Sequence, residues 1–536
     1  MSFTYLNVET NYSMNGSNIT CLDLVNKAKE YKFPFLAIAD KKMYGVINFY
    51  KTCLAHDIKP LIGLTVTLEG MNTESRNEVL LYALDNDGYN NLLTLSSIEA
   101  EKEYITLSTM KEHNKGVIAV YVSVNSELQK YFINNMKNEF IETINSLNLT
   151  FKDYFISVSK DEAFNQYFNK MKKLVYADKV EYLNEGDVEV SQTLRKIFNK
   201  NTDDLFETNR NAYFKPFVEE NYQYKEALAN VLYIAKHCNV TLDFSKTHLP
   251  SYPLVGKTNA KEYLRALVVK GLEKRIKGTG KDKKRYTERM NFELKVIDDM
   301  GYNDYFLIVW DFVKYAKNKG YLIGPGRGSA AASLVSYCLG ITSVDSIEYD
   351  LVFERFLNPE RITLPDIDMD LPDDKRDDII SYVKDFYGVE KVASICTFGT
   401  FQMKSAIRDT ARVLGLEGLI IDEVIKHLGG YDTIKEAVND SETVKNIMSR
   451  NEDAYKLLNI AKDIEGLNKH VSTHAAGIIV SADDLTKHTA LQPGLLNMNQ
   501  TQYEAKDLES LGLLKIDFLG LRNLTIIDKI TDFSTK

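Results

Sequence analysis

Apolar runs alternate with amphipathic segments along the first 241 residues. The run FPFLAIAD (33–40) precedes the amphipathic segment GVINFYKTCLAHDI, and a second run, KPLIGLTVTL, occupies residues 59–68. A succession of strand, helix and strand is typical of an α/β domain, although the pattern alone does not separate a barrel from an open sheet. A helical stretch at 221–240 closes this part. We therefore predict a first domain over residues 1–241.

The pattern changes beyond residue 241. A polar stretch with prolines, SKTHLPSYPLVGKTNAKEY, is typical of a linker, and helical patterns then fill residues 260–320. The lysine-rich residues 277–286 are expected to form an exposed loop. Residues 398–470 have a purely helical pattern, whereas apolar runs at 475–481 and 512–520 return to strand character. These shifts predict an α/β multidomain protein.

Composition agrees with several globular domains. The chain has 536 residues, 44% of them hydrophobic and 26% charged, and this length predicts roughly three or four domains. It contains no run of 18 apolar residues and no signal-peptide pattern at its start. Its five cysteines are scattered and never form CxxC, which disfavours a disulfide framework. We expect a cytoplasmic protein that does not associate with membranes.

The net charge of −9 restricts contact with nucleic acid to local basic faces, because proteins that bind DNA over their whole surface are usually basic. One such face is predicted. Lys404, Arg408 and Arg412 recur every four residues and therefore share one side of a helix. This stripe is suited to DNA phosphates, but a merely solvated face beside Asp409 explains it equally well.

A glycine loop stands between a predicted strand and a predicted helix in YLIGPGRGSAAASLVSYCLG (321–340). Three glycines, at 324, 326 and 328, allow a sharp turn and a close approach of ligand to backbone. Ser329 is the expected N-cap of a helix over 330–339, Gly340 its C′ residue, and Arg327 an added positive charge. The loop lacks the Gly-Lys-Ser/Thr of a Walker A motif. It predicts either a phosphate site or a simple tight turn with a capped helix.

An acidic run follows in LPDIDMDLPDDKRDD (364–378). Asp366, Asp368 and Asp370 are spaced by two and would project from one face of an extended strand. Like charges in that arrangement repel, and a hard divalent cation such as Mg²⁺ would relieve the repulsion. Two such ions can serve phosphoryl transfer. The alternative is a solvated acidic edge strand.

Three segments together carry a family resemblance: GPGRGSAAASLVSYCLGIT, FERFLNPERITLPDIDMD and LLKIDFLGLRNLT. They resemble the C-family polymerases of bacteria, the alpha subunits of DNA polymerase III of the DnaE type. The resemblance is dense from about 290 to 530 and weaker toward the N-terminus. It implies a PHP-like α/β barrel (1–241), a palm of the polymerase-beta-like nucleotidyltransferase kind (242–397 and 474–536) and an all-helical thumb (398–473).

Site residues follow from the resemblance by motif. It implies catalytic metal ligands for two Mg²⁺ ions at Asp366, Asp368 and Asp517, with Asp370 a weaker candidate. It implies that Gly328 and Ser329, with Arg327 beside them, hold a triphosphate, and that Arg355 and Lys515 lie close by. A structural ion pair for Arg355 and a surface position for Lys515 are the alternatives. His474 is expected to be structural, and Ala332 departs from the glycine usual in the family.

The resemblance also predicts that the PHP-like domain has lost its metals. The HxH segment of that domain reads here as Tyr5 to Glu9, and an Asp-His motif reads as Asp40-Lys41. A later ligand segment reads Asp178-Lys179-Val180-Glu181. Lysine supplies a cation where a metal would lie. We expect no metal in residues 1–241.

The leading hypothesis is a DNA-directed DNA polymerase that transfers a nucleotide from dNTP to a primer 3′-hydroxyl. Its substrates would be primer-template DNA and dNTP. The alternatives are a PHP-type phosphoesterase or exonuclease, which the lost histidines disfavour, and a non-enzymatic scaffold. The sequence stops nineteen residues after Asp517. The fingers and later domains, which would bind a sliding clamp and other replisome proteins, are expected to be missing, and the piece is expected to be inactive alone.

Overall fold

The chain forms two compact units in a computed structural model that describes residues 3–72, 74–199, 210–254, 259–360 and 365–535. The first unit combines Met1–Leu242 with Thr397–Ser472, and the second combines Asp243–Cys396 with Thr473–Lys536. Parts of the predicted linker, and Leu364 at the start of the acidic run, lie outside the described residues. Among the described helices, none is long and apolar enough to cross a membrane.

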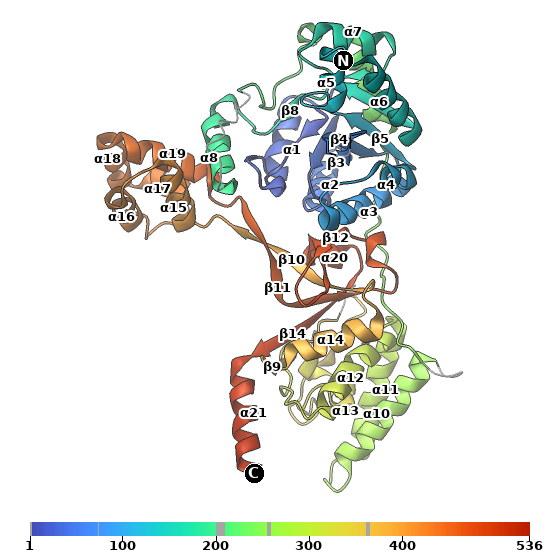
Figure 1. Ribbon diagram of the computed structural model, residues 1–536. Coiled ribbons are helices and arrows are strands. Elements are labelled where there is room, and N and C mark those ends of the chain that lie inside the picture. Colours follow the sequence, from blue (N-terminus) through green and yellow to red (C-terminus); the bar gives the residue numbers. More distant parts are fainter. Residues whose placement is uncertain (1–2, 73, 200–209, 255–258, 361–364, 536) are drawn as a thin grey trace. The chain divides into compact units, whose positions relative to one another are not determined.

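A six-stranded mixed sheet forms the centre of the first unit (Figure 1). Its strands, in spatial order, are β2 (Phe35–Asp40), β3 (Lys59–Glu69), β4 (Arg76–Ala83), β5 (Val117–Tyr121), β6 (Asp153–Ser157) and β7 (Leu174–Val175). The β2–β3, β5–β6 and β6–β7 pairs are parallel, and β4 is antiparallel to both neighbours. The expected strand–helix–strand over 33–68 is confirmed by β2, α2 (Val46–Ala55) and β3.

The described strands do not close into the barrel that the resemblance implied. The six-stranded sheet ends at β2 and β7, and β1 (Asn7–Val8) pairs only with β8 (Lys179–Val180), in parallel. These two short strands place residues from opposite ends of the domain side by side. The pairing matters because it brings Glu9 next to Lys179.

Helices surround this sheet, and several begin at a side-chain cap that their sequence supplies. Thr20, Asp85 and Asp161, for example, accept a hydrogen bond from a backbone N–H in the first turn of the helix each precedes. Besides α2, the helices of this part are α1 (Cys21–Glu30), α3 (Asn86–Lys102), α4 (Leu107–Glu112), α5 (Glu127–Ile133), α6 (Lys137–Thr150), α7 (Glu162–Lys170), α8 (Val188–Phe198) and α9 (Lys225–His237).

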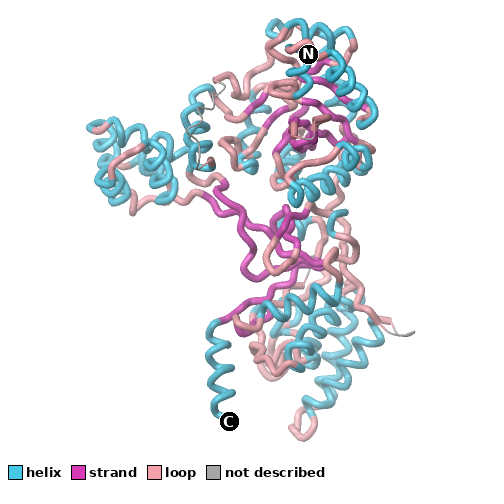
Figure 2. The backbone as a smooth tube through the Cα atoms, in the orientation of Figure 1, coloured by secondary structure: helices cyan, strands magenta, loops and turns pink. Residues whose placement is uncertain are grey.

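A helical segment belongs to the same unit. Figure 2 shows the two strands, β10 (Val392–Thr400) and β11 (Asn468–Val480), that lead into and out of it. The pattern predicted helix throughout residues 398–470, but residues 398–400 and 468–470 belong to these strands. The helices are α15 (Met403–Leu414), α16 (Gly418–His427), α17 (Ile434–Asp440), α18 (Glu442–Arg450) and α19 (Glu452–Ile464). Their core also includes Val190, Leu194 and Ile197 of α8.

The second unit has its own six-stranded sheet, in the order β12-β13-β10-β11-β14-β9. The strands not yet introduced are β9 (Met369–Pro372), β12 (Leu491–Pro493), β13 (Asn499–Glu504) and β14 (Leu514–Leu521). β14 lies between two partners, antiparallel to β11 and parallel to β9. This strand, next to the edge strand β9, contains Lys515 and Asp517.

Helices pack on that sheet around one apolar core, in which Phe306, Phe312 and Phe518 are fully buried. They are α10 (Ala260–Ile276), α11 (Lys283–Asp299), α12 (Asn303–Asn318), α13 (Leu334–Leu339) and α14 (Arg376–Tyr387). The unit also contains α20 (Ala505–Ser510) and α21 (Arg522–Thr535), and the side chains of Ile526, Ile530 and Phe533 on α21 are exposed. The expected loop at 277–286 is shorter than predicted, because α11 begins at Lys283 behind its N-cap, Asp282.

Candidate nucleotidyl-transfer site

Strand β14 brings Asp517 to the acidic run across about 150 residues of sequence. Gly477 of β11 lies opposite Asp517, and Met369 of β9 lies opposite Phe518. Because Phe518 is paired with Met369, the parallel register places Asp517 beside Asp368. The strand ladder therefore assembles the site from two distant motifs.

Three carboxylates meet there. Asp366, Asp368 and Asp517 each offer an oxygen within 4.8 Å of the others. Asp517 is only 8% exposed, whereas Asp368 is partly exposed and Asp366 is exposed. One oxygen of the buried group, Oδ1 of Asp517, has no hydrogen-bond partner among the described residues. A buried hydrogen-bond acceptor without a partner is costly, so this triad of aspartates is suited to binding a cation.

The electrostatics agree with that reading. Burial raises the pKa of Asp366, and the charges of Asp368 and Asp517 add to this against the opposing charge of Lys515. Burial also opposes the charge of Lys515, but its hydrogen bond to Asp517, together with the negative charges of Asp517, Asp366 and Glu509, outweighs burial and raises the pKa of Lys515. The Nζ of Lys515 lies 2.6 Å from Oδ2 of Asp517. Lys515 thus offsets part of the negative charge of the three carboxylates.

The donor set fits a hard divalent cation. Mg²⁺ takes oxygen ligands, commonly one or two carboxylates together with water and phosphate oxygens. Three converging carboxylates and an unpartnered buried oxygen supply that chemistry. In the part of the chain that the structure describes, no second set of three His, Cys, Asp or Glu side chains meets as closely.

Asp370 does not belong to the triad. It lies on β9, is 8% exposed, and its Oδ1 accepts a hydrogen bond from Nε of Arg327 at 3.2 Å. Arg327 also reaches Asp368, with 3.3 Å between Nη2 and Oδ2. The expected strand with three aspartates on one face is therefore wrong in part, because β9 begins only at Met369. Gly324 packs against Asp370, since a Cβ there would lie 2.6 Å from the Cβ of Asp370.

The α-helix after the glycine loop begins later than predicted. Residues 321–327 form no described strand, Gly328–Ala332 form a 3-10 helix, and α13 follows. Its N-cap is Ser333 and not Ser329, because the Ser333 hydroxyl accepts the Ser336 N–H. Gly340 takes the left-handed conformation with φ +74°, so the predicted C′ residue is confirmed.

The loop backbone remains open where the resemblance places a triphosphate. Gly328 has φ +62° and nothing within 4 Å of the position of a Cβ, and the side chains of Arg327 and Ser329 are exposed. Ala332, which departs from the family pattern, is buried, and its carbonyl accepts a hydrogen bond from Arg289.

A buried glutamate on α11 fixes this loop, and sequence reasoning missed it. Glu293 is fully buried and accepts hydrogen bonds from the Ser333 hydroxyl and from the backbone N–H groups of Leu334 and Val335, each at 3.0 Å. Arg289 pairs with it at 2.6 Å. A glutamate within an amphipathic helix is ordinary, so no sequence pattern indicates this role.

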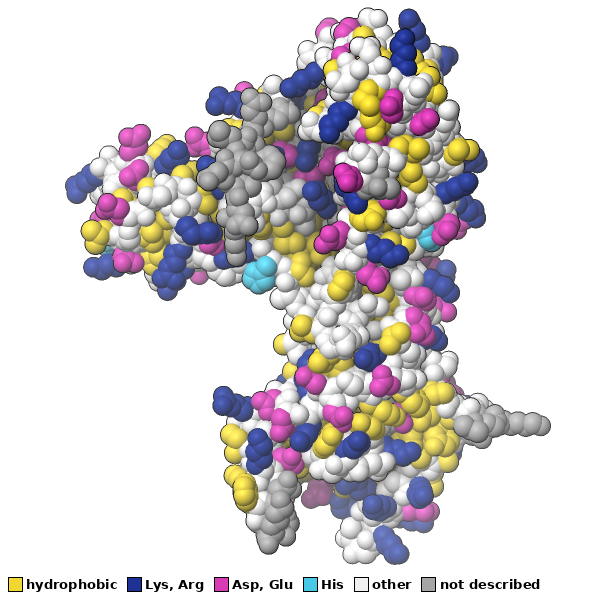
Figure 3. All heavy atoms as spheres, in the orientation of Figure 1, with side chains coloured by type: hydrophobic (Ala, Val, Ile, Leu, Met, Phe, Trp, Pro, Cys, Tyr) yellow, Lys and Arg dark blue, Asp and Glu magenta, His cyan; other side chains and the backbone are white. Residues whose placement is uncertain are grey.

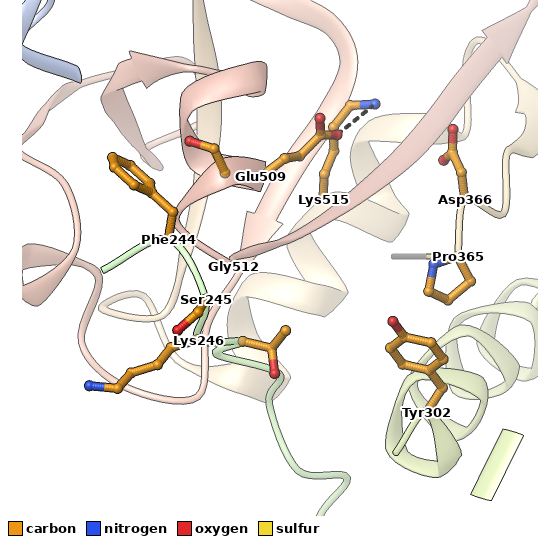
Figure 4. A pocket seen from close by; sticks show the side chains of 11 residues that line it. Phe244, Ser245, Lys246, Tyr302, Pro365, Asp366, Glu509, Gly512 and Lys515 are labelled. Carbon is orange, nitrogen blue, oxygen red and sulfur yellow. Dashed lines mark ion pairs between the residues drawn. The ribbon is translucent and has the colours of Figure 1, made fainter. Parts of the chain in front are cut away.

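A pocket of about 490 Å³ adjoins the triad on the side of Lys515. Figure 4 shows Glu509 and Lys515 joined as an ion pair there, with 3.7 Å between Oε1 and Nζ, and Asp366 on the same wall. Arg355 is exposed at the end of the 3-10 helix Phe353–Arg355, and no ion pair among the described residues joins it to the triad. The structure thus brings Lys515 to the site, but shows no such contact for Arg355.

His474 also lies near Asp517. Burial lowers the pKa of its imidazole, while the charge of Asp517 acts in the opposite direction. Its Nδ1 accepts backbone hydrogen bonds from Ala476 at 3.2 Å and from Gly477 at 2.7 Å. The expected structural role therefore has a physical basis, since the ring caps two N–H groups of β11.

Known proteins match this chain over its whole length. Residues 262–520 match the family described as bacterial DNA polymerase III alpha NTPase domain, and residues 6–161 match the PHP domain. The DNA polymerase III subunit alpha of Bacillus subtilis is 38% identical over 562 aligned residues, which cover 100% of this chain and 50% of that protein. Those of Halalkalibacterium halodurans and Staphylococcus aureus are 35% and 36% identical, over 99% and 98% of this chain.

The chain belongs to the family of bacterial DNA polymerase III alpha subunits. The resemblance read from the three motifs is thereby confirmed. The chain spans about half the length of the curated relatives it matches, and it corresponds to their N-terminal half. A solved amidohydrolase structure from Chromobacterium violaceum aligns with 34% of this chain and 89% of that chain at 10% identity, with a TM-score of 0.25.

In this polymerase III relative, the PHP domain holds a buried charge network. The Nζ of Lys179 lies 3.1 Å from an oxygen of Glu9 and 3.1 Å from an oxygen of Glu181, and Arg195 also pairs with Glu181. Burial opposes ionisation of Glu9, but Lys179 and a hydrogen bond from Asn15 hold the pKa of Glu9 below its ordinary value. The lysine predicted from sequence does lie among carboxylates.

The basic stripe of this polymerase III relative lies on α15 in the first unit. Lys404, Arg408 and Arg412 are exposed, and Arg412 pairs with Asp409 at 3.3 Å. Asp409 is shared with Lys469 at 2.7 Å. In Figure 3, basic and acidic side chains are interspersed over the lobe formed by α15 to α19.

Proposed function

We propose that the triad is the metal-binding centre of template-directed nucleotidyl transfer, and that the chain is the catalytic part of a DNA polymerase. The observation that carries this proposal is the convergence of Asp366, Asp368 and Asp517 within 4.8 Å, in a chain aligned from end to end with polymerase III alpha subunits. Composition alone, with a net charge of −9, would not have suggested it.

The proposed reaction joins the primer 3′-oxygen to the α-phosphorus of a dNTP and breaks the bond to pyrophosphate. Two bound Mg²⁺ ions would supply charge neutralisation for the attacking oxygen and the leaving group. Asp366, Asp368 and Asp517 would hold the ions, and the proton of the 3′-hydroxyl would pass to solvent or to a base in the site. We propose no side chain for that base.

The remaining residues would bind and orient phosphate. Lys515, already 2.6 Å from Asp517, places an ammonium where negative charge on a triphosphate would gather. The open backbone of Gly328 and Ser329, with the exposed Arg327 beside it, is suited to the outer phosphates. We keep Arg355 as a proposed triphosphate contact on the family motif alone.

We propose that the PHP-like domain is a metal-free scaffold. The ammonium of Lys179 provides between Glu9 and Glu181 the positive charge that a metal would otherwise supply. This disfavours the phosphoesterase and exonuclease alternatives. Primer-template DNA would be held partly by the stripe on α15, whereas a sliding clamp and other replisome proteins would bind elsewhere in the longer relatives.

Primer extension by Asp517→Asn tests the proposal. The variant is made in a polypeptide of the relatives' full length, and also in this chain if it extends primers. We expect the extension rate to fall by at least about 100-fold, with little change in thermal stability. Asp385→Asn, which neutralises an exposed aspartate on α14, is the matched control and should extend normally. Near-normal synthesis by Asp517→Asn would refute the assignment.

A further inference from the structure

The imidazole of His474 has a fixed tautomer. Its Nδ1 is the acceptor for two backbone N–H groups, those of Ala476 at 3.2 Å and Gly477 at 2.7 Å. A ring nitrogen that accepts carries no proton, so the single proton of the neutral ring belongs on Nε2. The hydrogen-bond network therefore assigns His474 as an Nε2–H donor.

Gly477 permits the ring to approach the triad. It is buried opposite Asp517 in the β11–β14 ladder. A Cβ at Gly477 would lie 2.9 Å from Nδ1 of His474 and 3.0 Å from Oδ1 of Asp517. A side chain at this position would therefore intrude between the histidine and the carboxylate. The missing side chain leaves the ring beside the oxygen of Asp517 that has no partner.

The donor on Nε2 faces no acceptor that the structure identifies. Among the described residues, no hydrogen bond from Nε2 is recorded, and the ring is partly exposed. His474 lines a recess of about 390 Å³ together with Arg376, Thr473 and Ser394. The recess therefore presents an imidazole N–H and a guanidinium next to a proposed metal site.

This tautomer excludes His474 as a metal ligand. Coordination through Nε2 would require its proton to move to Nδ1, where two backbone N–H groups already point. What remains is donation to an anionic oxygen. Phosphate oxygens are the anionic groups that the proposed reaction brings to this place.

We propose that His474 donates its Nε2–H to a phosphate oxygen of the substrate bound at the triad, and so acts as a substrate-positioning residue. The inference rests on the proposed nucleotidyl-transfer function. The phosphate is either in the dNTP or in the terminal linkage of the primer strand. The same donor chemistry serves both, and the kinetic constants separate them.

Two substitutions test the two ring nitrogens of His474 separately. Asn in His474→Asn can place its amide oxygen near the position of Nδ1 and keep the cap of β11, but it has no group at the position of Nε2. Gln in His474→Gln can place an amide donor near Nε2, but leaves the N–H groups of Ala476 and Gly477 uncapped. A structural role and a substrate role therefore predict opposite patterns.

The experiment is primer extension with both variants in the full-length protein, together with thermal unfolding. We expect His474→Asn to keep its Tm and lose about 10- to 100-fold in kcat/KM, as for a hydrogen bond to a charged group. His474→Gln should lose thermal stability yet retain most activity per folded molecule. A raised KM for dATP would assign the dNTP, and weaker primer-template binding would assign the primer.

Two further readings keep this inference separate from the proposed function. Nitrogen NMR of the histidines should show His474 protonated on Nε2 in the free protein. Normal extension by His474→Asn, with Asp517→Asn inactive, would overturn the histidine inference alone. Activity in Asp517→Asn would instead overturn the proposed function on which it rests.

Discussion

At the scale of the residue, Lys179 decides the character of the PHP-like domain. It is the cation between two carboxylates that are almost fully buried, Glu9 at 1% and Glu181 at 5% exposure. Desolvating like charges is costly, and only an ion pair of good geometry offsets that cost. We propose that this charge network, and not metal coordination, holds this part of the domain together.

Lys179→Met should cost about 3–5 kcal/mol of unfolding free energy at neutral pH, because buried Glu9 loses its cation and Glu181 keeps only Arg195. In the native protein, the lowered pKa of Glu9 stabilises the fold above the ordinary glutamate pKa, and this contribution is lost as pH falls through the lowered value. The variant lacks that contribution. Its deficit should therefore shrink as pH falls through the lowered pKa of Glu9.

Urea unfolding of both proteins, from neutral pH to well below the ordinary glutamate pKa, measures this difference. Lys170→Met is the matched control, since Lys170 is exposed at the end of α7, and it should be nearly neutral at every pH. A deficit that grew on acidification would contradict the assigned network. Metal analysis of the same domain should find no stoichiometric Zn²⁺ or Mn²⁺.

At the scale of the element, α15 tests whether a basic stripe contacts DNA. Changing Lys404, Arg408 and Arg412 together to Gln should lower the slope of log K against log salt by about 2 to 3, if each makes one phosphate contact. Arg412 shares its charge with Asp409, so its own contribution should be smallest. Filter binding or anisotropy with primer-template DNA across a salt series gives the slope.

The control variant changes the charge by the same amount, but on the neighbouring helices. Lys426, Lys435 and Lys456 are exposed on α16, α17 and α19, and their joint change to Gln should leave the slope nearly unaltered. If both triple variants gave equal slopes, net charge alone would explain the effect. The stripe would then be a solvated face.

At the scale of the whole molecule, the helices α15 to α19 share a core with α8, which lies more than 200 residues earlier in the chain. Leu194 of α8 is 1% exposed in that core. Leu194→Ala should cost about 2–5 kcal/mol through lost burial and a residual cavity. Hydrogen exchange should show lost protection in α15 and α19 as well as in α8, because the three helices support one another.

Leu149→Ala provides the comparison for this prediction. Leu149 is 71% exposed at the end of α6, so its truncation should change stability little. If Leu194→Ala loosened α8 alone, the shared core would not be a cooperative unit. The helical segment and the N-terminal part would then unfold independently.

The sequence determined the features that depend on neighbours along the chain. The alternation of apolar and polar positions located β2, α2 and β3, and Gly340 ended α13 as predicted, since periodicity and turn chemistry are local. The motifs around Asp366, Gly328 and Asp517 identified the family. They also identified the chemistry, because alternating carboxylates suggest a divalent cation wherever they lie.

Only the tertiary structure decided which residues meet. The register of β14 between β9 and β11 selects Asp366, Asp368 and Asp517 and leaves Asp370 to Arg327. Long-range contacts likewise give Ser333 the cap that Ser329 was expected to form, supported by Glu293 from α11, and place α8 in the core of α15 and α19. Strand ladders and packing join segments that no local pattern relates, so the family motifs named the three aspartates but only the fold shows how they meet.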